Sequence, residues 1–323
     1  MGDVHGRSST IARPMTKGLL LARLEGRARA RKRAGTKLGR RDSRFGLSLI
    51  APTVVLVGLV TLFPMIRAFL LSVHATTFLT QGRFVGLEQY KQFLDEPFGV
   101  SSLISTAVFT VGSVLLIFPF ATLLAILLNQ PFRGRTLVRT LLILPWIVSP
   151  ILSALMWGWT VEATIGPIPY LLNAWFGVNL DVFANGGTAM ITLIVVNVWR
   201  TFPFAMVLIL AALQTIPVEI YEAAELDGAG EFRRLISVTI PMISGTLLIA
   251  LIMVTINCVN MVDLPLILTG GGPVHATDIL GLKVYREAFF LNRFGYASAI
   301  AMIMLAINAV ISIAYIRVLR RED

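Results

Sequence analysis

Residues 187–213 read GTAMITLIVVNVWRTFPFAMVLILAAL, a run with a single charged residue, Arg200. An α-helix rises about 1.5 Å per residue, so this run is long enough to cross the roughly 30 Å hydrocarbon core of a bilayer. Its apolar residues are continuous and do not alternate with period two, which favours a helix over a barrel strand. The run therefore predicts a transmembrane helix.

Five further runs have the same character. The 323-residue chain is 56% hydrophobic and only 14% charged, with a mean hydropathy of +0.78, whereas soluble domains carry about 25% charged residues. This composition excludes a soluble enzyme, a disulfide scaffold and a disordered chain. The fold class predicted is all-α, a polytopic membrane helix bundle of six transmembrane helices, the other five lying near residues 46–73, 102–128, 138–160, 242–268 and 297–317.

The net charge of the chain lies entirely in its N-terminal segment. Residues 1–45 hold 13 Lys or Arg and three acids, while residues 46–323 hold 15 of each sign. We interpret residues 1–45 as a disordered cytoplasmic tail near acidic lipid headgroups, and we expect no nucleic-acid partner. With the tail inside, the inner segments carry 21 basic residues and the outer connections five. Both termini are therefore predicted to be cytoplasmic.

The connection between the fourth and fifth runs has the composition of a helical hairpin. Pro217 suits the first turn of a helix, and Glu222 and neighbouring glutamates favour its positively polarised end. Gly228 and Gly230 then interrupt the pattern before an apolar face resumes. Residues 217–241 are predicted to form a helix, a glycine break and a second short helix on the cytoplasmic side.

The sequence of this connection resembles the EAA signature of permease subunits in binding-protein-dependent ABC importers. Two further blocks, Trp199–Phe204 and Leu268–Pro273, occur at the matching places in the six-span frame and resemble the sugar and glycerol-3-phosphate branch of that family. The resemblance covers residues 46–321, taken as the permease domain. The signature is carried by Glu222-Ala223-Ala224, by Gly228, and by Val238-Thr239-Ile240-Pro241.

In the family the EAA loop is the coupling helix, which is seated in a cleft of a cytoplasmic ATPase. The resemblance implies a second homologous permease subunit, an ATPase dimer that binds ATP and magnesium, and an extracytoplasmic solute-binding protein, all at the bacterial plasma membrane. The chain itself is expected to be a transport subunit with no nucleotide site, cofactor or metal site of its own. A solvated amphipathic loop is the alternative interpretation. The residues assigned to coupling are Glu222, Ala223, Ala224, Asp227, Gly228 and Pro241.

Polar residues inside the predicted spans indicate the substrate path. Arg200 lies near mid-membrane, where a lipid-exposed charge costs about 2.5–3.5 kcal/mol on insertion scales. Asn257 and Asn260 are three residues apart and share a helix face. Pro203 is expected to break the helix beside Arg200. These residues either line a cavity or hold the bundle together through interhelical hydrogen bonds or an ion pair with Asp263.

The resemblance assigns several of these positions to the membrane sugar site. The segment from Arg200 to Phe204 matches one part of that site in the maltose system, and Asn257 and Asn260 fall on two asparagines of another part. Phe204 falls on an aromatic residue that stacks on a sugar, and Thr201 on a small residue that lines the site. Arg200 replaces an apolar residue there, so the polarity of the site differs. The predicted substrate path comprises Arg200, Thr201, Phe204, Asn257 and Asn260.

Together these features predict a subunit of an ABC importer that moves a disaccharide or oligosaccharide by alternating access driven by a separate ATPase. Import of glycerol-3-phosphate or a similar phosphorylated polyol is the alternative within the same class, because Arg200 suits a phosphate. An ion-coupled secondary transporter is the alternative from another class. A membrane-embedded transferase is not favoured, because the acidic residues between Glu219 and Glu231 lack the Asp-rich spacing of such enzymes.

Overall fold

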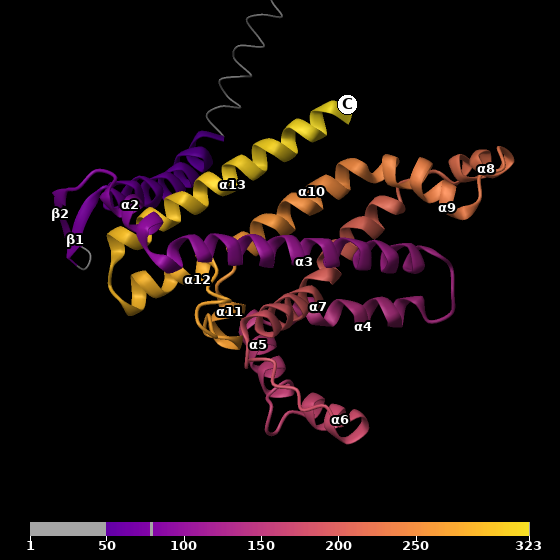
Figure 1. Cartoon of the computed structure of the whole chain (residues 1–323). Helices are drawn as coiled ribbons and strands as arrows, with labels where there is room; N and C mark the ends of the chain where they lie inside the picture. Colours follow the sequence, from indigo (N-terminus) through magenta and orange to yellow (C-terminus); the bar gives the residue numbers. More distant parts are fainter. Residues whose placement is uncertain (1–49, 78–79, 323) are drawn as a thin grey trace, which may run out of the picture. The chain divides into compact units, whose positions relative to one another are not determined.

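The computed structural model describes residues 50–77 and 80–322, so the predicted tail at 1–45 lies outside the described residues (Figure 1). The chain divides into two compact units, Met1–Ile66 and Arg67–Asp323. The described part of the first unit belongs to an apolar helix, Ile50–Ser72, which is long enough to cross a membrane. Its position agrees with the first predicted span.

The second unit is mostly helical. Its one sheet in the described residues is a short antiparallel pair of strands that the sequence did not predict. The elements in chain order are β1 His74–Thr77, β2 Thr80–Phe84, α2 Glu88–Asp95, α3 Pro97–Asn129, α4 Arg135–Ile147, α5 Pro150–Thr160, α6 Pro167–Phe176, α7 Gly186–Leu213, α8 Val218–Leu226, α9 Glu231–Arg234, η1 Leu235–Thr239, α10 Ile240–Val259, α11 Asp263–Leu268, α12 Leu280–Tyr285, η2 Arg286–Phe290 and α13 Phe294–Glu322.

Helix α7 forms the centre of the bundle. Its first turn is capped by Asn185, whose Oδ1 accepts a hydrogen bond from the backbone N–H of Thr188 at 2.9 Å. Of its most hydrophobic window, 61% is buried, against 28% for α3 and 17% for α13. Helices α3, α4 and α10 pack against it. Most residues of α7 are therefore packed against other parts of the protein.

The third predicted span, 138–160, is not one straight or gently kinked helix. The structure has α4 and α5, whose axes differ by 96°. Pro150 begins α5, and the preceding Ser149 is extended, with φ −54° and ψ 141°. Proline disfavours the helical conformation of the residue before it, which accounts for the break at this point. The described residues thus contain five helices long enough to cross a membrane, or six if α4 and α5 together form one span.

The fifth predicted span, 242–268, is also divided differently. A continuous helical stretch runs over Glu231–Val259, and Asp263–Leu268 is a separate short helix. A wider π-helical turn, Leu235–Thr239, precedes Pro241. Pro241 has no amide hydrogen for the carbonyl one turn earlier, which accounts for the widened turn. The predicted hairpin therefore continues directly into α10.

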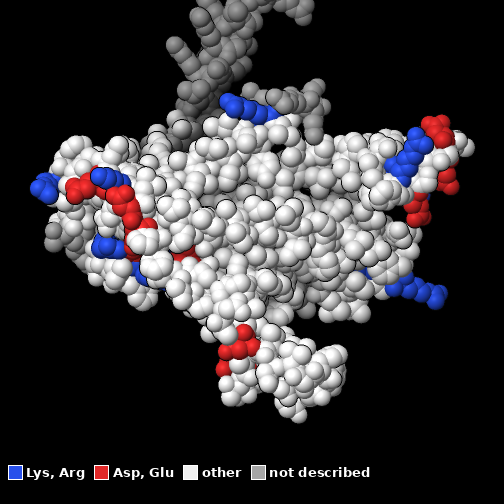
Figure 2. All heavy atoms as spheres, viewed as in Figure 1, with Lys and Arg blue, Asp and Glu red and all other residues white. Residues whose placement is uncertain are grey.

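Charged side chains gather mainly at the two ends of the bundle. On the face in Figure 2, one group lies over α8 and α9 and another over the end that holds α2 and the two strands, and most of the surface between them is uncharged. Smaller groups lie near α5 and α6 and near the C-terminal end of α13. This distribution is typical of a protein whose middle lies in hydrocarbon and whose ends lie in water. The prediction of a multi-span α-helical membrane bundle is confirmed.

Candidate functional site

A small cavity of about 180 Å³ lies between α4, α7 and α10. Four of the five residues predicted for the substrate path line it. They come from two helices that are separated in sequence by the hairpin, so the fold brings them together. The lining consists of Trp146 on α4, Arg200, Thr201 and Phe204 on α7, and Met253, Val254 and Asn257 on α10.

The α7 residues of the cavity are presented by an unbroken helix. Pro203 lies inside α7 and does not end it, so the expected break beside Arg200 is not found. Because proline has no N–H, the carbonyl of Trp199 still lacks its helical donor. Arg200 and Phe204 are four residues apart and half-buried, while Thr201 is buried. One helix face therefore presents a cation, a hydroxyl and an aromatic ring.

The two predicted asparagines have different surroundings. Asn257 is exposed and lines the cavity. Asn260 ends α10, and its Nδ2 donates to the carbonyl oxygen of Ile256 at 2.7 Å. Its Oδ1 accepts a hydrogen bond from Asn308 on α13 at 3.1 Å. Asn260 therefore matches the interhelical alternative, and Asn257 matches the cavity.

A buried polar cluster beside the cavity was missed by the sequence analysis. Asn197 Nδ2 donates to Ser113 Oγ on α3 at 3.0 Å and to Cys258 Sγ on α10 at 3.4 Å. Thr201 Oγ1 donates to Asn197 Oδ1 at 3.2 Å. All four side chains are buried. The cluster joins three helices and fixes the hydroxyl of Thr201. The sequence signal was present, because Asn197 is a polar residue in an apolar run, one turn before Thr201.

Asp263, the predicted alternative partner of Arg200, does not form an ion pair with it. Asp263 is exposed in the first turn of α11. It attracts Arg200 through space but is not within ion-pair distance. The Nε atom of Arg200 is buried and has no hydrogen-bond partner among the described residues. The charge of Arg200 therefore faces the cavity without an ion pair to any carboxylate of the described chain.

Trp146 gives the cavity a second aromatic surface. Its ring centroid lies 5.8 Å from that of Phe204, with 32° between the ring planes. Tryptophan at the end of a span is often an interface anchor, but here the side chain lines the cavity. Two flat apolar faces and a few fixed polar groups are the usual features of small-molecule sites.

The predicted hairpin has the expected helix–glycine–helix form. Helix α8 ends before Gly228, which has a φ of +76°, a conformation that side chains disfavour. Helix α9 follows, and Arg234 pairs with Glu225 across the break at 3.2 Å. Most of the predicted coupling residues are exposed: Glu222, Ala223, Asp227, Gly228 and Pro241, with Ala224 half-buried.

Apolar side chains are also exposed on this hairpin. Leu226 and Phe232 are 90% and 75% exposed, and Figure 1 shows α8 and α9 together at one end of the bundle. A groove of about 630 Å³ separates the hairpin from the end of α3, and Tyr221 and Glu231 contribute to its lining. A surface that combines exposed apolar groups with carboxylates is typical of a docking site for another protein.

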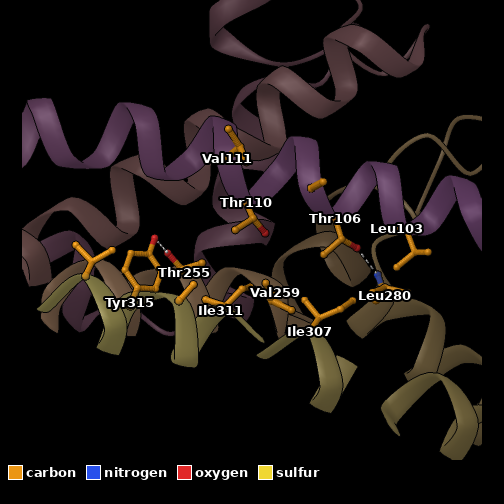
Figure 3. A pocket seen from close by; sticks show the side chains of 13 residues that line it. Leu103, Thr106, Thr110, Val111, Thr255, Val259, Leu280, Ile307, Ile311 and Tyr315 are labelled. Carbon is orange, nitrogen blue, oxygen red and sulfur yellow. Dashed lines mark hydrogen bonds between the residues drawn. The ribbon is translucent and has the colours of Figure 1, made fainter. Parts of the chain in front are cut away.

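A third hollow, of about 610 Å³, lies between α3, α10 and α13 (Figure 3). Its lining is almost entirely apolar, and Val111, Val259 and Ile311 are typical members. Two threonines of α3 also face it. Thr106 Oγ1 accepts a hydrogen bond from the backbone N–H of Leu280 at 2.8 Å, whereas the buried hydroxyl of Thr110 has no partner among the described residues. A sugar offers mostly hydroxyl groups, so this groove does not suit it.

At the end of the bundle that holds α2, Glu96 connects three elements. Lys283 Nζ lies 3.3 Å from Glu96 Oε2, and the hydroxyl of Tyr296 donates to the same oxygen. Burial acts to raise the pKa of Glu96, but the Tyr296 hydrogen bond and the Lys283 charge outweigh it and hold the pKa below its ordinary value. The carboxylate therefore stabilises the contact between α12, α13 and the start of α3.

Comparison with known proteins connects these features to a family. Residues 117–322 match the family described as "Binding-protein-dependent transport system inner membrane component". The chain belongs to this family. The predicted recognition is confirmed, and the matched residues of this permease include the whole cavity lining and the hairpin.

Relatives of this permease match it over nearly its whole length. The sulfoquinovosyl glycerol transport system permease SmoG of Agrobacterium fabrum is 30% identical over 87% of this chain and 92% of its own length. The trehalose/maltose transport system permease MalF of Thermococcus litoralis is 32% identical over 89% of this chain and 98% of its own. The sn-glycerol-3-phosphate transport system permease UgpA of Rhizobium meliloti is 32% identical over 80% and 89%.

A solved structure has the same fold. It is the crystal structure of a bacterial ABC transporter involved in the import of the acidic polysaccharide alginate, and one of its chains aligns with this permease at a TM-score of 0.77 and 20% identity. The alignment covers 88% of this chain and 99% of that chain. The family match shows that the chain is a membrane-spanning transport subunit, and the solved structure shows that it has the fold of ABC transporter permeases.

Proposed function

We propose that this permease is the membrane subunit of an ABC importer for a carbohydrate or a related polyol. The observation that carries this proposal is the cavity between α4, α7 and α10. Arg200, Thr201 and Asn257 supply polar groups to it, and Trp146 and Phe204 supply aromatic faces. Amide, hydroxyl and cationic groups bind sugar hydroxyls, and an aromatic ring covers the apolar face of a sugar ring.

The size of the cavity limits what this chain binds alone. At about 180 Å³ it is smaller than the roughly 300–1,000 Å³ of ordinary ligand pockets. It accommodates one sugar-sized unit of a longer substrate. A second homologous permease subunit completes the path in this proposal, and a disaccharide or oligosaccharide lies across both subunits.

The exposed hairpin is the proposed docking site for a cytoplasmic ATPase. Glu222 offers a carboxylate to a basic partner, Ala223 permits close approach, and the turn at Gly228 sets the angle between α8 and α9. Because the hairpin continues into α10 through Leu235–Thr239, a force on it reaches a helix that lines the cavity. ATP and magnesium are bound by the ATPase partner and not by this chain.

Transport in this proposal follows alternating access. Closure of the ATPase dimer moves the hairpin inward, the cavity opens outward, and an extracytoplasmic solute-binding protein delivers substrate. Hydrolysis returns the cavity to the inward-facing state. Each step requires that the partner interact differently with the two states. Both termini and the hairpin are placed on the cytoplasmic side, as the distribution of basic residues favours.

The proposal is tested by reconstituting the complete transporter in vesicles and measuring uptake of labelled trehalose, maltose and glycerol-3-phosphate. We expect uptake that requires ATP and persists when ionophores collapse ion gradients. Glu222→Lys should release the ATPase during co-purification, while Glu219→Lys, an exposed residue of the same helix outside the signature, should retain it. Uptake by this chain without an ATPase, driven by an ion gradient, would instead favour a secondary transporter.

A further inference from the structure

Arg200, like Arg135 and Arg139 of α4, has a buried Nε atom with no hydrogen-bond partner among the described residues. Arg234, Arg286 and Arg293 each lie within 3.2 Å of a carboxylate oxygen. Within the described part of the chain, Arg200 makes no hydrogen bond or ion pair, and its Nε is buried. It nevertheless lies in the middle of α7, the most buried span. A cation placed there is stabilised only if it faces water or an anion.

Among the described residues, the guanidinium of Arg200 is the one charged group that lines the cavity. The other polar side chains that line it, Thr201 and Asn257, are neutral, so the lining carries one positive charge and no negative one. Thr201 donates its proton to Asn197, which leaves its oxygen lone pairs as acceptors towards the cavity. Asn257 makes no side-chain hydrogen bond within the described residues, so its amide is free to bind a hydroxyl.

These side chains together suit a ligand that has an anionic group and a sugar or polyol part. A guanidinium group binds an oxyanion through two parallel N–H···O hydrogen bonds, a geometry that a neutral hydroxyl cannot use fully. The amide and hydroxyl groups beside it suit sugar or polyol hydroxyls, and Phe204 with Trp146 covers an apolar ring face. Free phosphate would use only the first part of this arrangement.

We propose that Arg200 selects substrates that carry an oxyanion, so that the imported compound is an acidic or phosphorylated carbohydrate or polyol and not a neutral sugar. This inference rests on the proposed function, because it assigns the charge of the compound that occupies the same cavity. A carboxylate, a sulfonate and a phosphate share the required chemistry, and the experiment separates them.

The test uses the complete transporter in detergent without the solute-binding protein, so that only the membrane site selects. Binding is measured by equilibrium dialysis for matched pairs: glucuronyl-glucose against cellobiose, 6-deoxy-6-sulfo-glucose against 6-deoxy-glucose, and glycerol-3-phosphate against glycerol. We expect at least one anionic member to bind about tenfold or more tightly than its neutral partner, since charge-assisted hydrogen bonds are about twice as strong as neutral ones. The pair with the largest ratio identifies the anionic group.

Three variants test whether Arg200 causes the preference for the anionic member of each pair. Arg200→Gln should abolish the preference for the anionic member, and Arg200→Lys should retain part of it. Asn257→Asp keeps Arg200 in place and adds a carboxylate to the cavity, so it should also reduce anion binding. Asn257→Asp keeps the proposal testable if Arg200→Gln fails to assemble.

The outcomes that overturn the inference are distinct from those that overturn the proposed function. Equal binding of anionic and neutral members, or an unchanged preference in Arg200→Gln, overturns the role of Arg200 while leaving a carbohydrate importer. Free phosphate or sulfate competing as well as the acidic sugars overturns the assignment of a carbohydrate anion. Absence of binding and ATP-driven uptake for every sugar and polyol tested overturns the proposed function itself.

Discussion

Asn308 on α13 donates a hydrogen bond to the side-chain oxygen of Asn260 at 3.1 Å, while Asn257, one turn earlier on α10, lines the cavity between α4, α7 and α10. The two asparagines share a helix face by spacing, yet one holds two helices together and the other is available to a ligand. Their substitutions should therefore have different consequences.

Asn257→Ala is expected to reduce substrate uptake by about tenfold, because it removes a ligand-facing amide, and to leave the melting temperature of the purified complex unchanged. Asn260→Ala removes an interhelical hydrogen bond, and such bonds average about 0.6 kcal/mol in membrane proteins. It should lower the melting temperature slightly. Uptake assays and thermal denaturation in detergent measure both effects. Equal loss of uptake with equal stability in the two variants contradicts this division of roles.

Gly228 and Gly230 offer a matched pair for the coupling hairpin. A Cβ on either glycine would meet no atom within 4 Å, but Gly228 has a φ of +76° and Gly230 a φ of −64°. A side chain in the left-handed region costs about 1–2 kcal/mol, whereas φ near −64° suits any residue. Gly228→Ala should therefore distort the angle between α8 and α9, and Gly230→Ala should not.

The measurement is the affinity of the permease for its ATPase, taken from titrated co-purification. Gly228→Ala should weaken it by about 5- to 30-fold if the backbone strain is transmitted fully to docking. Gly230→Ala should remain close to the unsubstituted chain. If both variants bind the ATPase normally, the turn at Gly228 does not set the docking geometry.

Thr106 and Thr110 are one turn apart on α3 and face the same apolar groove, but only Thr106 is hydrogen-bonded (Figure 3). Thr106→Val leaves the buried N–H of Leu280, at the start of α12, without an acceptor, which costs about 1–3 kcal/mol. Thr110→Val removes a hydroxyl that has no partner among the described residues and should be neutral or stabilising. Thermal denaturation of both variants checks this. A destabilised Thr110→Val would mean that its hydroxyl has a partner outside the described residues.

The sequence predicted the features that depend on local pattern. Long apolar runs indicated the spans, and Pro217 with Gly228 indicated the helix–break–helix hairpin. The resemblance to the permease family assigned Arg200 and Asn257 to one membrane site, and both residues line the same cavity. Whether the hairpin contacts an ATPase, and on which side of the membrane it lies, stays a prediction.

The features that could not be predicted depend on contacts between distant residues. Asn260 and Asn308 are 48 residues apart, and Ser113 and Asn197 are 84 apart, so neither pairing follows from helix periodicity. The 96° bend after α4 differs from the kinked but unbroken helix that we expected at the prolines of this run. A proline in a buried bundle is compatible with either a kinked or an interrupted helix, and packing decides between them.

Glu96 leads to a prediction about acid stability. Burial opposes its ionisation, but Tyr296 and Lys283 outweigh burial and hold its pKa in the folded protein below the ordinary value of 4.5. A group with a lowered folded pKa contributes stability that is fully present above its unfolded pKa and is lost as the pH falls through the folded pKa. The ion pair should therefore stabilise the fold at neutral pH and cease to do so as the pH falls below about 4.5.

Glu96→Gln should lower the stability of the purified complex by up to about 1 kcal/mol at neutral pH, the upper range for a partly exposed ion pair. Its melting temperature should approach that of the unsubstituted chain as the pH falls below 4.5. Glu88→Gln is the control, because Glu88 is exposed in the first turn of α2 and undergoes the same chemical change. Thermal denaturation across this pH range gives the comparison. If the melting temperatures of Glu96→Gln and the unsubstituted chain differ by the same amount at all pH values, the substitution acts through packing and not through charge. Only a titrating carboxylate gives a difference that disappears in acid.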